Sequence, residues 1–335
     1  MTIKVAVVGC GSISRERHVP EFAANPNAKI VALCDLVKER AEKLAEPYGA
    51  KVFTDYKEML KMKDIDVVSV CTPNYLHAQV TIDSFKAGKH VLCEKPMCTT
   101  VEEGEAMIKA AKKAGKILMI AQNQRYMPAH VKAKEILDSG KLGKVYSFRT
   151  IFGHGGPESW SVEKKNTWFF RKNEAIFGAM GDLGVHKIDL IRHLLDEKFI
   201  YASAFIDRLE KKYPDGKPID VDDNAVCILR GKSGVMGEVI ASWTYKIGDN
   251  STEIYCEKGV LKLYKGQFPL SVEYNYHEKE NFTFADKKSG VMDAFIDCIV
   301  NNKTPLITGE EGLKTMKIVF ACVESSKKKT MVEIK

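Results

Sequence analysis

The chain has 335 residues, of which 45% are hydrophobic and 28% charged, and its formal net charge at pH 7 is +7. This is the composition of a folded protein, and the length favours two domains. No apolar run reaches the roughly 18–20 residues that cross a bilayer, and residues 1–5 do not resemble a secretory signal, so we expect a cytoplasmic protein. The nine cysteines contain no C-x-x-C pair, and no metal site is expected. The positive charge falls in short clusters, so neither nucleic acid nor a membrane is an expected partner.

Short apolar runs alternate with helix-period segments through the first 122 residues. The apolar runs are Ile3–Val8, Lys29–Cys34, Val67–Cys71, His90–Cys93 and Ile117–Ala121. The helix-period segments are Val37–Glu46, Tyr56–Lys61, His77–Ala87 and Val101–Ala114. Near-continuous apolar strands between amphipathic helices indicate a parallel sheet covered on both faces. Residues 1–122 are therefore predicted to form a doubly wound Rossmann domain within an α/β fold class.

The pattern changes after Gln122. Helical spacing is expected at 128–140, 181–195, 291–301 and 311–325, and an irregular stretch at 154–173. Strand-like runs occur at 145–152 and then in succession from Tyr201 to Tyr276. Successive strands favour a largely antiparallel sheet. Residues 123–335 are thus predicted to form a second, α+β domain that binds substrate, supplies catalytic groups and mediates oligomerisation.

A glycine-rich turn directly follows the first apolar run, with the sequence Gly9-Cys10-Gly11-Ser12-Ile13-Ser14. In such a turn the first glycine permits the tight bend, and the second lets the backbone approach a pyrophosphate. The N–H groups at the following helix N-terminus, near Ser12 and Ile13, then face the phosphates.

Asp35 ends the second apolar run, where an acidic residue accepts a hydrogen bond from a ribose hydroxyl. Asp35 could equally cap the next helix, or do both. Its carboxylate would repel a 2′-phosphate, which favours NAD, while Lys38 and Arg40 nearby keep NADP open.

Two tripeptides follow later strands at the carboxyl edge of the predicted sheet, where ligands bind in such folds. Thr72-Pro73-Asn74 is a candidate cofactor contact, although an ordinary proline turn explains it equally well. Glu94-Lys95-Pro96 is the second candidate. On residue chemistry alone, Lys95 would more simply be an exposed surface lysine.

The tripeptide Glu94-Lys95-Pro96, the Gly9-x-Gly11 turn and the later segment Gly181-Asp182-x-Gly184-x-His186-x-x-Asp189 together resemble the glucose–fructose oxidoreductase / inositol dehydrogenase family (Gfo/Idh/MocA). The resemblance covers nearly the whole chain. It implies a Rossmann domain joined to a domain with a large, mostly antiparallel open sheet that often supports homodimers or homotetramers. The implied activity is NAD(P)-dependent oxidation or reduction at a CH–OH group of a sugar, an inositol-like cyclic polyol or a related small molecule.

Carried over by position, Lys95 resembles the family's catalytic lysine, and Asp182 and His186 resemble its acid and base pair. The four-residue spacing places Asp182 and His186 on one helix face, which Gly181 and Gly184 would let approach the substrate. Without the resemblance, a capping aspartate and a core histidine would be preferred.

Weaker candidates for substrate contact follow the last Rossmann strand and lie in the irregular stretch. Arg125 and Tyr126 could instead hold the domains together, and burial of the tryptophans against the sheet is the more usual outcome. The six candidates are Gln122, Arg125, Tyr126, His154, Trp160 and Trp168. Two other functions remain open: a redox-neutral glycosidase that retains NAD, and a non-catalytic nucleotide sensor.

Overall fold

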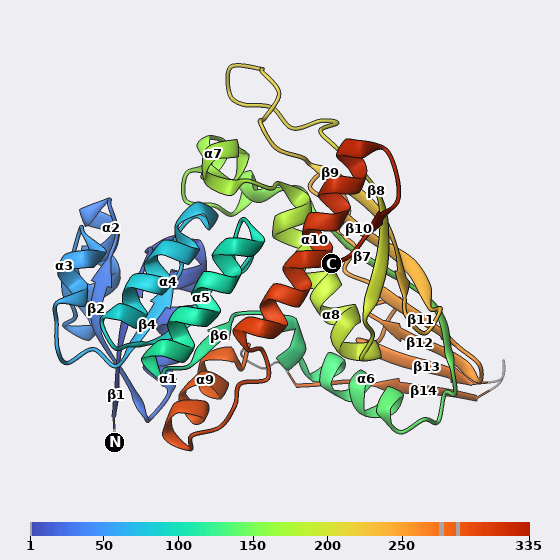
Figure 1. Cartoon of the computed structure of the whole chain (residues 1–335), viewed down its shortest axis with the longest axis horizontal. Helices are drawn as coiled ribbons and strands as arrows, with labels where there is room; N and C mark the ends of the chain where they lie inside the picture. The colour runs from blue at the N-terminus through green and yellow to red at the C-terminus, as the bar shows by residue number, and fades with distance from the viewer. Residues whose placement is uncertain (1, 275–277, 286–288) are drawn as a thin grey trace. The chain divides into compact units, whose positions relative to one another are not determined.

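The computed structural model describes residues 2–274, 278–285 and 289–335 (Figure 1). It divides into two compact units. Unit 1 comprises Met1–Gln122, Trp160–Trp168 and Lys288–Lys314; unit 2 comprises Asn123–Ser159, Phe169–Lys287 and Thr315–Lys335. Two later segments therefore join the N-terminal residues in unit 1, which the sequence pattern did not indicate.

Unit 1 contains a six-stranded parallel sheet, as predicted. Its strands are β1 (Ile3–Val8), β2 (Ala28–Cys34), β3 (Lys51–Phe53), β4 (Val67–Val70), β5 (His90–Cys93) and β6 (Leu118–Ile120). The strand order is β3-β2-β1-β4-β5-β6, and every pairing is parallel. This is the doubly wound Rossmann order, in which a crevice opens at the carboxyl ends of the strands where the order reverses, here between β1 and β4.

Helices cover the sheet of unit 1, which is why its strands are apolar on both sides: all four residues of β4 are buried. The helices are α1 (Val19–Ala24), α2 (Lys38–Ala45), α3 (Tyr56–Leu60), α4 (His77–Lys86), α5 (Val101–Ala114) and α9 (Val291–Val300). Thr100 begins α5 by accepting a hydrogen bond from the Glu103 N–H, and Gly115 ends it in the left-handed conformation. A π-helical turn, Ser14–His18, precedes α1.

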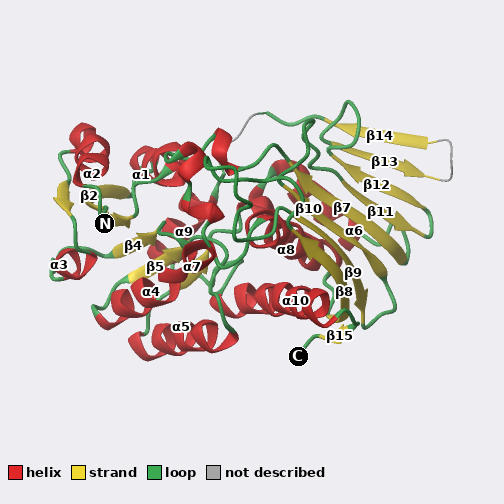
Figure 2. Cartoon of the chain, turned by 90° about the horizontal axis from the view of Figure 1, so that it is seen from above, coloured by secondary structure: helices red, strands yellow, loops and turns green. Residues whose placement is uncertain are grey.

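Unit 2 contains a nine-stranded sheet with the order β14-β13-β12-β11-β7-β10-β9-β8-β15 (Figure 2). Among the described strands, β7 and β10 pair in parallel and the remaining neighbours are antiparallel. The strands are β7 (Val145–Gly153), β8 (Phe199–Asp207), β9 (Asn224–Gly231), β10 (Met236–Ser242), β11 (Thr252–Cys256), β12 (Gly259–Leu263), β13 (Leu270–Tyr274), β14 (Glu278–Phe282) and β15 (Val332–Glu333). The end of the run expected to reach Tyr276 lies outside the described residues. The predicted fold class is confirmed.

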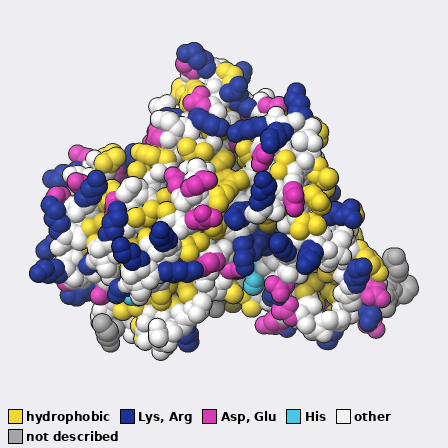
Figure 3. Space-filling model, viewed as in Figure 1, with side chains coloured by type: hydrophobic (Ala, Val, Ile, Leu, Met, Phe, Trp, Pro, Cys, Tyr) yellow, Lys and Arg dark blue, Asp and Glu magenta, His cyan; other side chains and the backbone are white. Residues whose placement is uncertain are grey.

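The helices assigned to unit 2 are α6 (Pro128–Asp138), α7 (Lys172–Ala175) and α8 (Val185–Leu195), and α10 (Gly309–Lys328) contributes residues to both units. Helices α6 and α8 lie on one side of the nine-stranded sheet (Figure 2). Residues of β9 alternate accordingly: Ala225, Cys227 and Leu229 are buried, whereas Val226 and Ile228 are exposed. Among the helices described, none is both long and apolar enough to span a bilayer. On the face shown in Figure 3, Lys and Arg side chains are interspersed with Asp and Glu.

Candidate active site

The glycine turn between β1 and the first helical turn has room for a ligand at one glycine and none at the other. Gly9 has φ +95°, and a Cβ there would lie 2.3 Å from the Cys71 carbonyl oxygen, so only glycine fits. The Ser14 hydroxyl donates to the Gly9 carbonyl and closes the turn. Beside Gly11, by contrast, no other residue comes within 4 Å of an added Cβ. This open space fits the close approach of a pyrophosphate.

Asp35 binds the glycine turn directly. Its Oδ2 accepts from the Cys10 N–H at 2.8 Å, and its Oδ1 accepts from the Val37 N–H at 2.8 Å. The N-cap of α2 is Val37, which makes no side-chain cap hydrogen bond, so the alternative that Asp35 caps this helix was wrong. The carboxylate instead orders the residues before α2 and lies beside the glycine turn. Of the nearby cations, Arg40 pairs with Glu163 at 2.8 Å, and Lys38 pairs with Glu42 on the surface of α2.

The segment Trp160–Trp168 lies against the same turn within unit 1. The Ser12 hydroxyl donates to the Trp160 carbonyl at 3.0 Å, and the Arg40–Glu163 ion pair makes a second connection. Trp160 and Trp168 therefore belong to the unit that carries the glycine turn.

The turns that follow β4 and β5 are held together by His77. Its Nδ1 lies 2.8 Å from the Pro96 carbonyl and its Nε2 lies 2.8 Å from the Thr72 carbonyl. Thr72 and Asn74 are buried here. The Thr72 Oγ1 has no hydrogen-bond partner among the described residues, so a polar atom at the carboxyl edge is available to a ligand.

Glu94 is held by a histidine that the sequence analysis did not single out. His18 Nε2 lies 2.8 Å from Glu94 Oε1, and the Lys95 N–H donates to Glu94 Oε2 at 3.0 Å. Burial opposes a charge on His18, but the neighbouring Cys71 and Glu94 outweigh it and raise its pKa to about 10. Burial likewise opposes the charge of Glu94, but the hydrogen bond with His18, together with the charges of His18 and Lys95, outweighs burial and lowers the pKa of the carboxyl. The pair fixes the backbone from which the half-buried Lys95 side chain projects.

In unit 2, the segment that carries Asp182 is a π-helical turn, Met180–Gly184, which continues into α8. Its start is tied to Asp222, whose carboxylate oxygens accept from the Gly178 and Met180 N–H groups at 2.8 Å each. Burial raises the pKa of Asp222. A π-turn is wider than an α-turn and is frequent at functional sites, so the expectation of regular α-helical spacing from Gly181 onward was wrong.

The expectation that Gly181 and Gly184 open this face to substrate was also wrong. A Cβ on Gly181 would lie 2.4 Å from the Phe177 Cβ, and one on Gly184 would lie 2.7 Å from the Met180 Sδ. Both glycines make room for neighbouring protein atoms, so their small size serves packing within unit 2.

Asp182 is oriented by a buried tryptophan. The Trp243 Nε1–H donates to Asp182 Oδ2 at 3.1 Å, and Trp243 is fully buried. The Phe170 ring lies 6.1 Å from Trp243 and adds to the apolar surroundings. Sequence analysis placed Trp243 inside a strand and gave it no role, because nothing in the local pattern connects it with Asp182.

His186 and His154 lie around one aromatic ring, that of Phe152. The centroid distances from Phe152 are 6.1 Å to His186 and 5.8 Å to His154. Phe152 and His154 are at the end of β7, beside the end of its parallel neighbour β10, and the His154 N–H donates to the Ser242 carbonyl at 2.9 Å. Unit 2 thus gathers His154 and His186 into one cluster, with Trp243 and its partner Asp182 adjoining it next to Ser242.

Lys187, the residue after His186, is buried completely. Its Nζ donates to the Asn250 carbonyl at 2.9 Å and lies 5.8 Å from the Phe152 ring centroid. Burial lowers the pKa of Lys187 to about 7, although Asp249 opposes this. Sequence analysis did not single out this lysine.

The buried Lys187 predicts a pH-dependent stability. An unfolded lysine has a pKa of 10.5, so between about pH 7 and 10.5 the unfolded chain binds more protons at this site than the folded chain does. The free energy of unfolding of the wild type should therefore rise over that window, by about 3–5 kcal/mol relative to a Lys187→Met variant. Urea unfolding of both proteins at pH 7, 8.5 and 10 measures the difference. Parallel pH dependences of the two proteins would contradict the assignment.

The remaining candidates are also placed within their own units. Gln122 is buried in unit 1, and its Oε1 has no hydrogen-bond partner among the described residues. Arg125 is buried in unit 2, where its Nε and Nη2 donate to Asp189 of α8 at 2.7 and 2.8 Å. Tyr126 follows in the same 3₁₀ turn and is partly exposed.

Unit 1 contains a Rossmann sheet with a glycine turn and an acidic residue after its second strand. Unit 2 carries an aspartate and a histidine on one helical segment. These features together define a two-domain dinucleotide-dependent oxidoreductase. Residues 3–122 match the family described as "Oxidoreductase family, NAD-binding Rossmann fold", and residues 130–262 match the "GFO/IDH/MocA C-terminal domain". The chain belongs to the Gfo/Idh/MocA oxidoreductase family. NAD as the cofactor and the family inferred from the motifs are both confirmed.

Several relatives resemble the chain over most of its length. Inositol 2-dehydrogenase of Salmonella typhimurium is 30% identical over 269 residues, which cover 78% of this chain and 74% of that protein. Levoglucosan dehydrogenase of Pseudarthrobacter phenanthrenivorans is 33% identical over 239 residues, covering 65% of this chain and only 60% of the relative. Among solved structures, levoglucosan dehydrogenase in complex with NADH and L-sorbose matches with a TM-score of 0.90 at 25% identity, over 100% of this chain and 99% of that one.

Proposed function

We propose that this chain is an NAD-dependent dehydrogenase that transfers hydride between nicotinamide and a hydroxyl or ketone carbon of a sugar, a cyclic polyol or a related small molecule. The observation that carries the proposal is the combination of an NAD-binding glycine turn with Asp182 and His186 on one helical segment, where Trp243 fixes Asp182. A nucleotide sensor has no need of such a pair. The inositol and levoglucosan dehydrogenases among the relatives support this substrate class.

In the oxidative direction, the chain's own groups manage the proton of the substrate hydroxyl. His186 accepts that proton, because a neutral imidazole is a competent base near pH 7. Asp182, oriented by Trp243, holds the substrate or the imidazole in place. Lys95 donates a hydrogen bond to the oxygen as negative charge develops on it. NAD, when bound, supplies the hydride acceptor.

Around these groups, the cofactor would be held by the turn at Gly9, Gly11, Ser12 and Ile13, by Asp35, and by the carboxyl-edge residues Thr72, Pro73, Asn74, Glu94 and Lys95. We propose His154 as a substrate contact because it shares the Phe152 ring with His186. Gln122, with its unpaired buried amide oxygen, is a second candidate. Trp160 and Trp168 are placed near the glycine turn by their segment, which suits contact with a ligand there.

A panel of substrates tests the function. Purified protein is assayed with inositols, aldoses, anhydrosugars and the corresponding ketones, with NAD and NADP in parallel, and NADH is followed by absorbance. We expect substrate-dependent formation or consumption of NADH with at least one member. Release of an aglycone from a glycoside without net NADH would instead identify the redox-neutral glycosidase, and no turnover with any member would count against a dehydrogenase of this class.

The cofactor preference depends on Asp35. Asp35→Asn keeps an acceptor oxygen for only one of the Cys10 and Val37 N–H groups, which now bind different oxygens of Asp35, but it removes the charge that repels a 2′-phosphate. We expect the ratio of kcat/KM with NADP to kcat/KM with NAD to rise by roughly tenfold or more. Steady-state kinetics with both cofactors measures the ratio. An unchanged ratio would mean that Arg40 or Lys38, and not Asp35, decides the preference.

We further propose a cytoplasmic homodimer or homotetramer that assembles through the open face of the nine-stranded sheet. Phe205 is 83% exposed on this sheet, and Val226, Ile228, Met236 and Tyr255 are exposed on the neighbouring strands. Such apolar clusters on a soluble surface mark interfaces. Light scattering of wild type and Phe205→Glu tests the proposal, since a charge in place of this exposed aromatic ring should yield monomers.

A further inference from the structure

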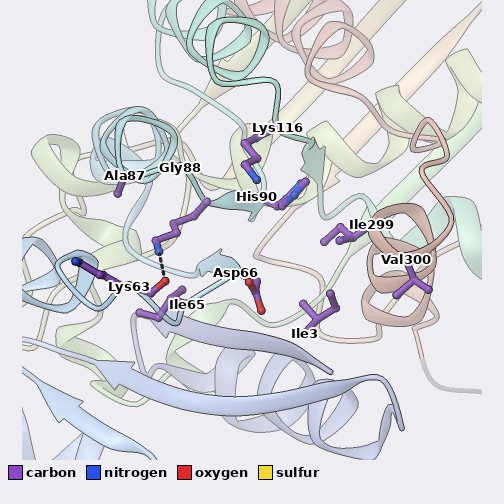
Figure 4. Close-up of a pocket in the computed structure, with 11 residues that line it drawn as sticks. Ile3, Lys63, Ile65, Asp66, Ala87, Gly88, His90, Lys116, Ile299 and Val300 are labelled. Atoms are coloured by element: carbon purple, nitrogen blue, oxygen red, sulfur yellow. Dashed lines mark hydrogen bonds between the residues drawn. The ribbon is translucent and has the colours of Figure 1, made fainter. Parts of the chain in front are cut away.

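Unit 1 contains a cavity of about 500 Å³ at the edge of its sheet opposite the cofactor turn (Figure 4). Ile3 begins β1, Asp66 precedes β4 and His90 begins β5, so the cavity lies at the amino ends of these strands. The glycine turn follows the carboxyl end of β1, six residues or roughly 20 Å away along the strand. The cavity is therefore separate from the cofactor site, and its volume is within the range of small-molecule sites.

The polar lining of the cavity carries an excess of positive charge. The charged residues that line it are Lys63, Lys89, Lys116 and Asp66, although the Lys63 ammonium points away from Asp66 in Figure 4. Lys89 is only 6% exposed, and its Nζ donates to the Met62 carbonyl at 3.1 Å and to the Lys63 carbonyl at 3.4 Å. An ammonium group has three hydrogens, so one donor remains for a ligand. Burial lowers the pKa of Lys89, and a bound anion would restore a favourable environment for its charge.

His90 adds a neutral donor to the cavity. Its Nδ1 accepts from the Ile117 N–H at 3.1 Å, which fixes the proton of the neutral ring on Nε2. Burial and the neighbouring Lys116 lower the pKa of His90 to about 4, so the ring is neutral at physiological pH. In Figure 4, His90 and Lys116 lie side by side at one end of the cavity.

The remaining lining residues, Asp66 and the apolar side chains, indicate what the ligand must contain besides its charge. Asp66 accepts from the Lys4 N–H through Oδ2, which leaves acceptor capacity for a ligand hydroxyl. Ile3, Ile65, Ile299 and Val300 form an apolar wall. A ligand that satisfies these groups has an anionic end for the lysines and His90, and a hydroxylated carbon skeleton for Asp66 and the apolar wall.

We propose that this cavity is a second ligand site, distinct from the cofactor and substrate sites, that binds a small hydroxylated anion of the sugar-phosphate or sugar-acid class. Both members of the class present the same features: negative charge at one end and hydroxyl groups along the chain. Through this site, the concentration of such a compound would affect unit 1 from the edge of its sheet opposite the cofactor turn.

Isothermal titration calorimetry of the NAD-saturated protein tests the proposal, because NAD then occupies the phosphate-binding turn. The probes are glucose 6-phosphate, gluconate and uncharged glucose at constant ionic strength. We expect saturable binding of at least one of the two anions that depends on the cavity lysines, whereas any binding of glucose, which lacks an anionic end, should not depend on them. The anion that binds more tightly identifies the phosphate or the carboxylate as the preferred group.

Matched variants locate the binding. Lys116→Met changes a partly exposed lysine of the cavity, and Lys113→Met removes the same charge from an exposed position of α5 outside it. We expect Lys116→Met and Lys89→Met to weaken binding by roughly tenfold or more, the value of a charged hydrogen bond, and Lys113→Met to leave it unchanged. Thermal unfolding establishes that each variant is folded. Absence of saturable binding of both anions to the wild type, or equal effects of Lys113→Met and Lys116→Met on that binding, would each overturn the proposal.

Discussion

Replacing His186 with alanine should lower kcat by about 10²–10⁴-fold, the usual contribution of a general base, while the affinity for NAD stays close to that of the wild type. The imidazole is the proposed proton acceptor, and it lies in unit 2, whereas the glycine turn and Asp35 are in unit 1. Stopped-flow or steady-state assays measure kcat, and titration of NADH fluorescence measures cofactor binding. A loss confined to kcat separates a chemical role from a general disturbance of the fold.

A second histidine on the same helix supplies the control. His193 lies two turns further along α8 and is partly buried, so His193→Ala removes an imidazole from the same element without touching the cluster around Phe152. We expect this variant to keep kcat within a small factor of the wild type. Equal losses in both variants, or an unchanged kcat in His186→Ala, would remove His186 from the mechanism.

Periodicity predicted the sheet of unit 1 well because a parallel strand covered on both faces must be apolar throughout, as in β4. The assignment of Trp160–Trp168 and of residues 288–314 to unit 1 was not predictable in the same way. These segments join the Rossmann residues through contacts such as Ser12 with Trp160, 148 positions apart, and no local period reports a contact at that separation. The π-turn at Met180–Gly184 was missed for a related reason, since its start depends on the distant Asp222.

In the candidate site, too, local features could be predicted from the sequence, whereas contacts between distant residues could not. Gly9 could be predicted because part of its role is local: its backbone has φ +95°, which favours glycine, although the clash of a Cβ with the distant Cys71 carbonyl was not predictable. His18 and Trp243 could not, because each acts on a partner far along the chain: His18 on Glu94, 76 residues away, and Trp243 on Asp182, 61 residues away. Lys187 escaped notice because lysine is usually exposed, and only the fold shows that this one is enclosed.

Replacing Asp189 with asparagine should lower the free energy of unfolding by about 3–5 kcal/mol, because the buried Arg125 guanidinium would lose the carboxylate charge to which it donates two hydrogen bonds. Both side chains are at most 3% exposed, and Asp189 Oδ1 also accepts from the Thr315 hydroxyl at 3.0 Å. Urea unfolding at pH 7 measures the loss. Glu135→Gln is the control, since it breaks the exposed Lys132–Glu135 pair on α6 and should cost roughly 1 kcal/mol or less.

The double variant Arg125→Met/Asp189→Leu tests why Asp189→Asn is less stable: because a buried charge loses its partner, or because the geometry of the pair is lost. Because both charges of this pair are removed, neither partner is left buried and charged, so this variant should recover much of the stability lost in Asp189→Asn. A double variant as unstable as the single one would mean that the geometry of the bidentate pair, and not its charge balance, stabilises unit 2. Recovery would show instead that Asp189, one turn beyond His186, serves to neutralise the arginine that holds the start of unit 2 to α8.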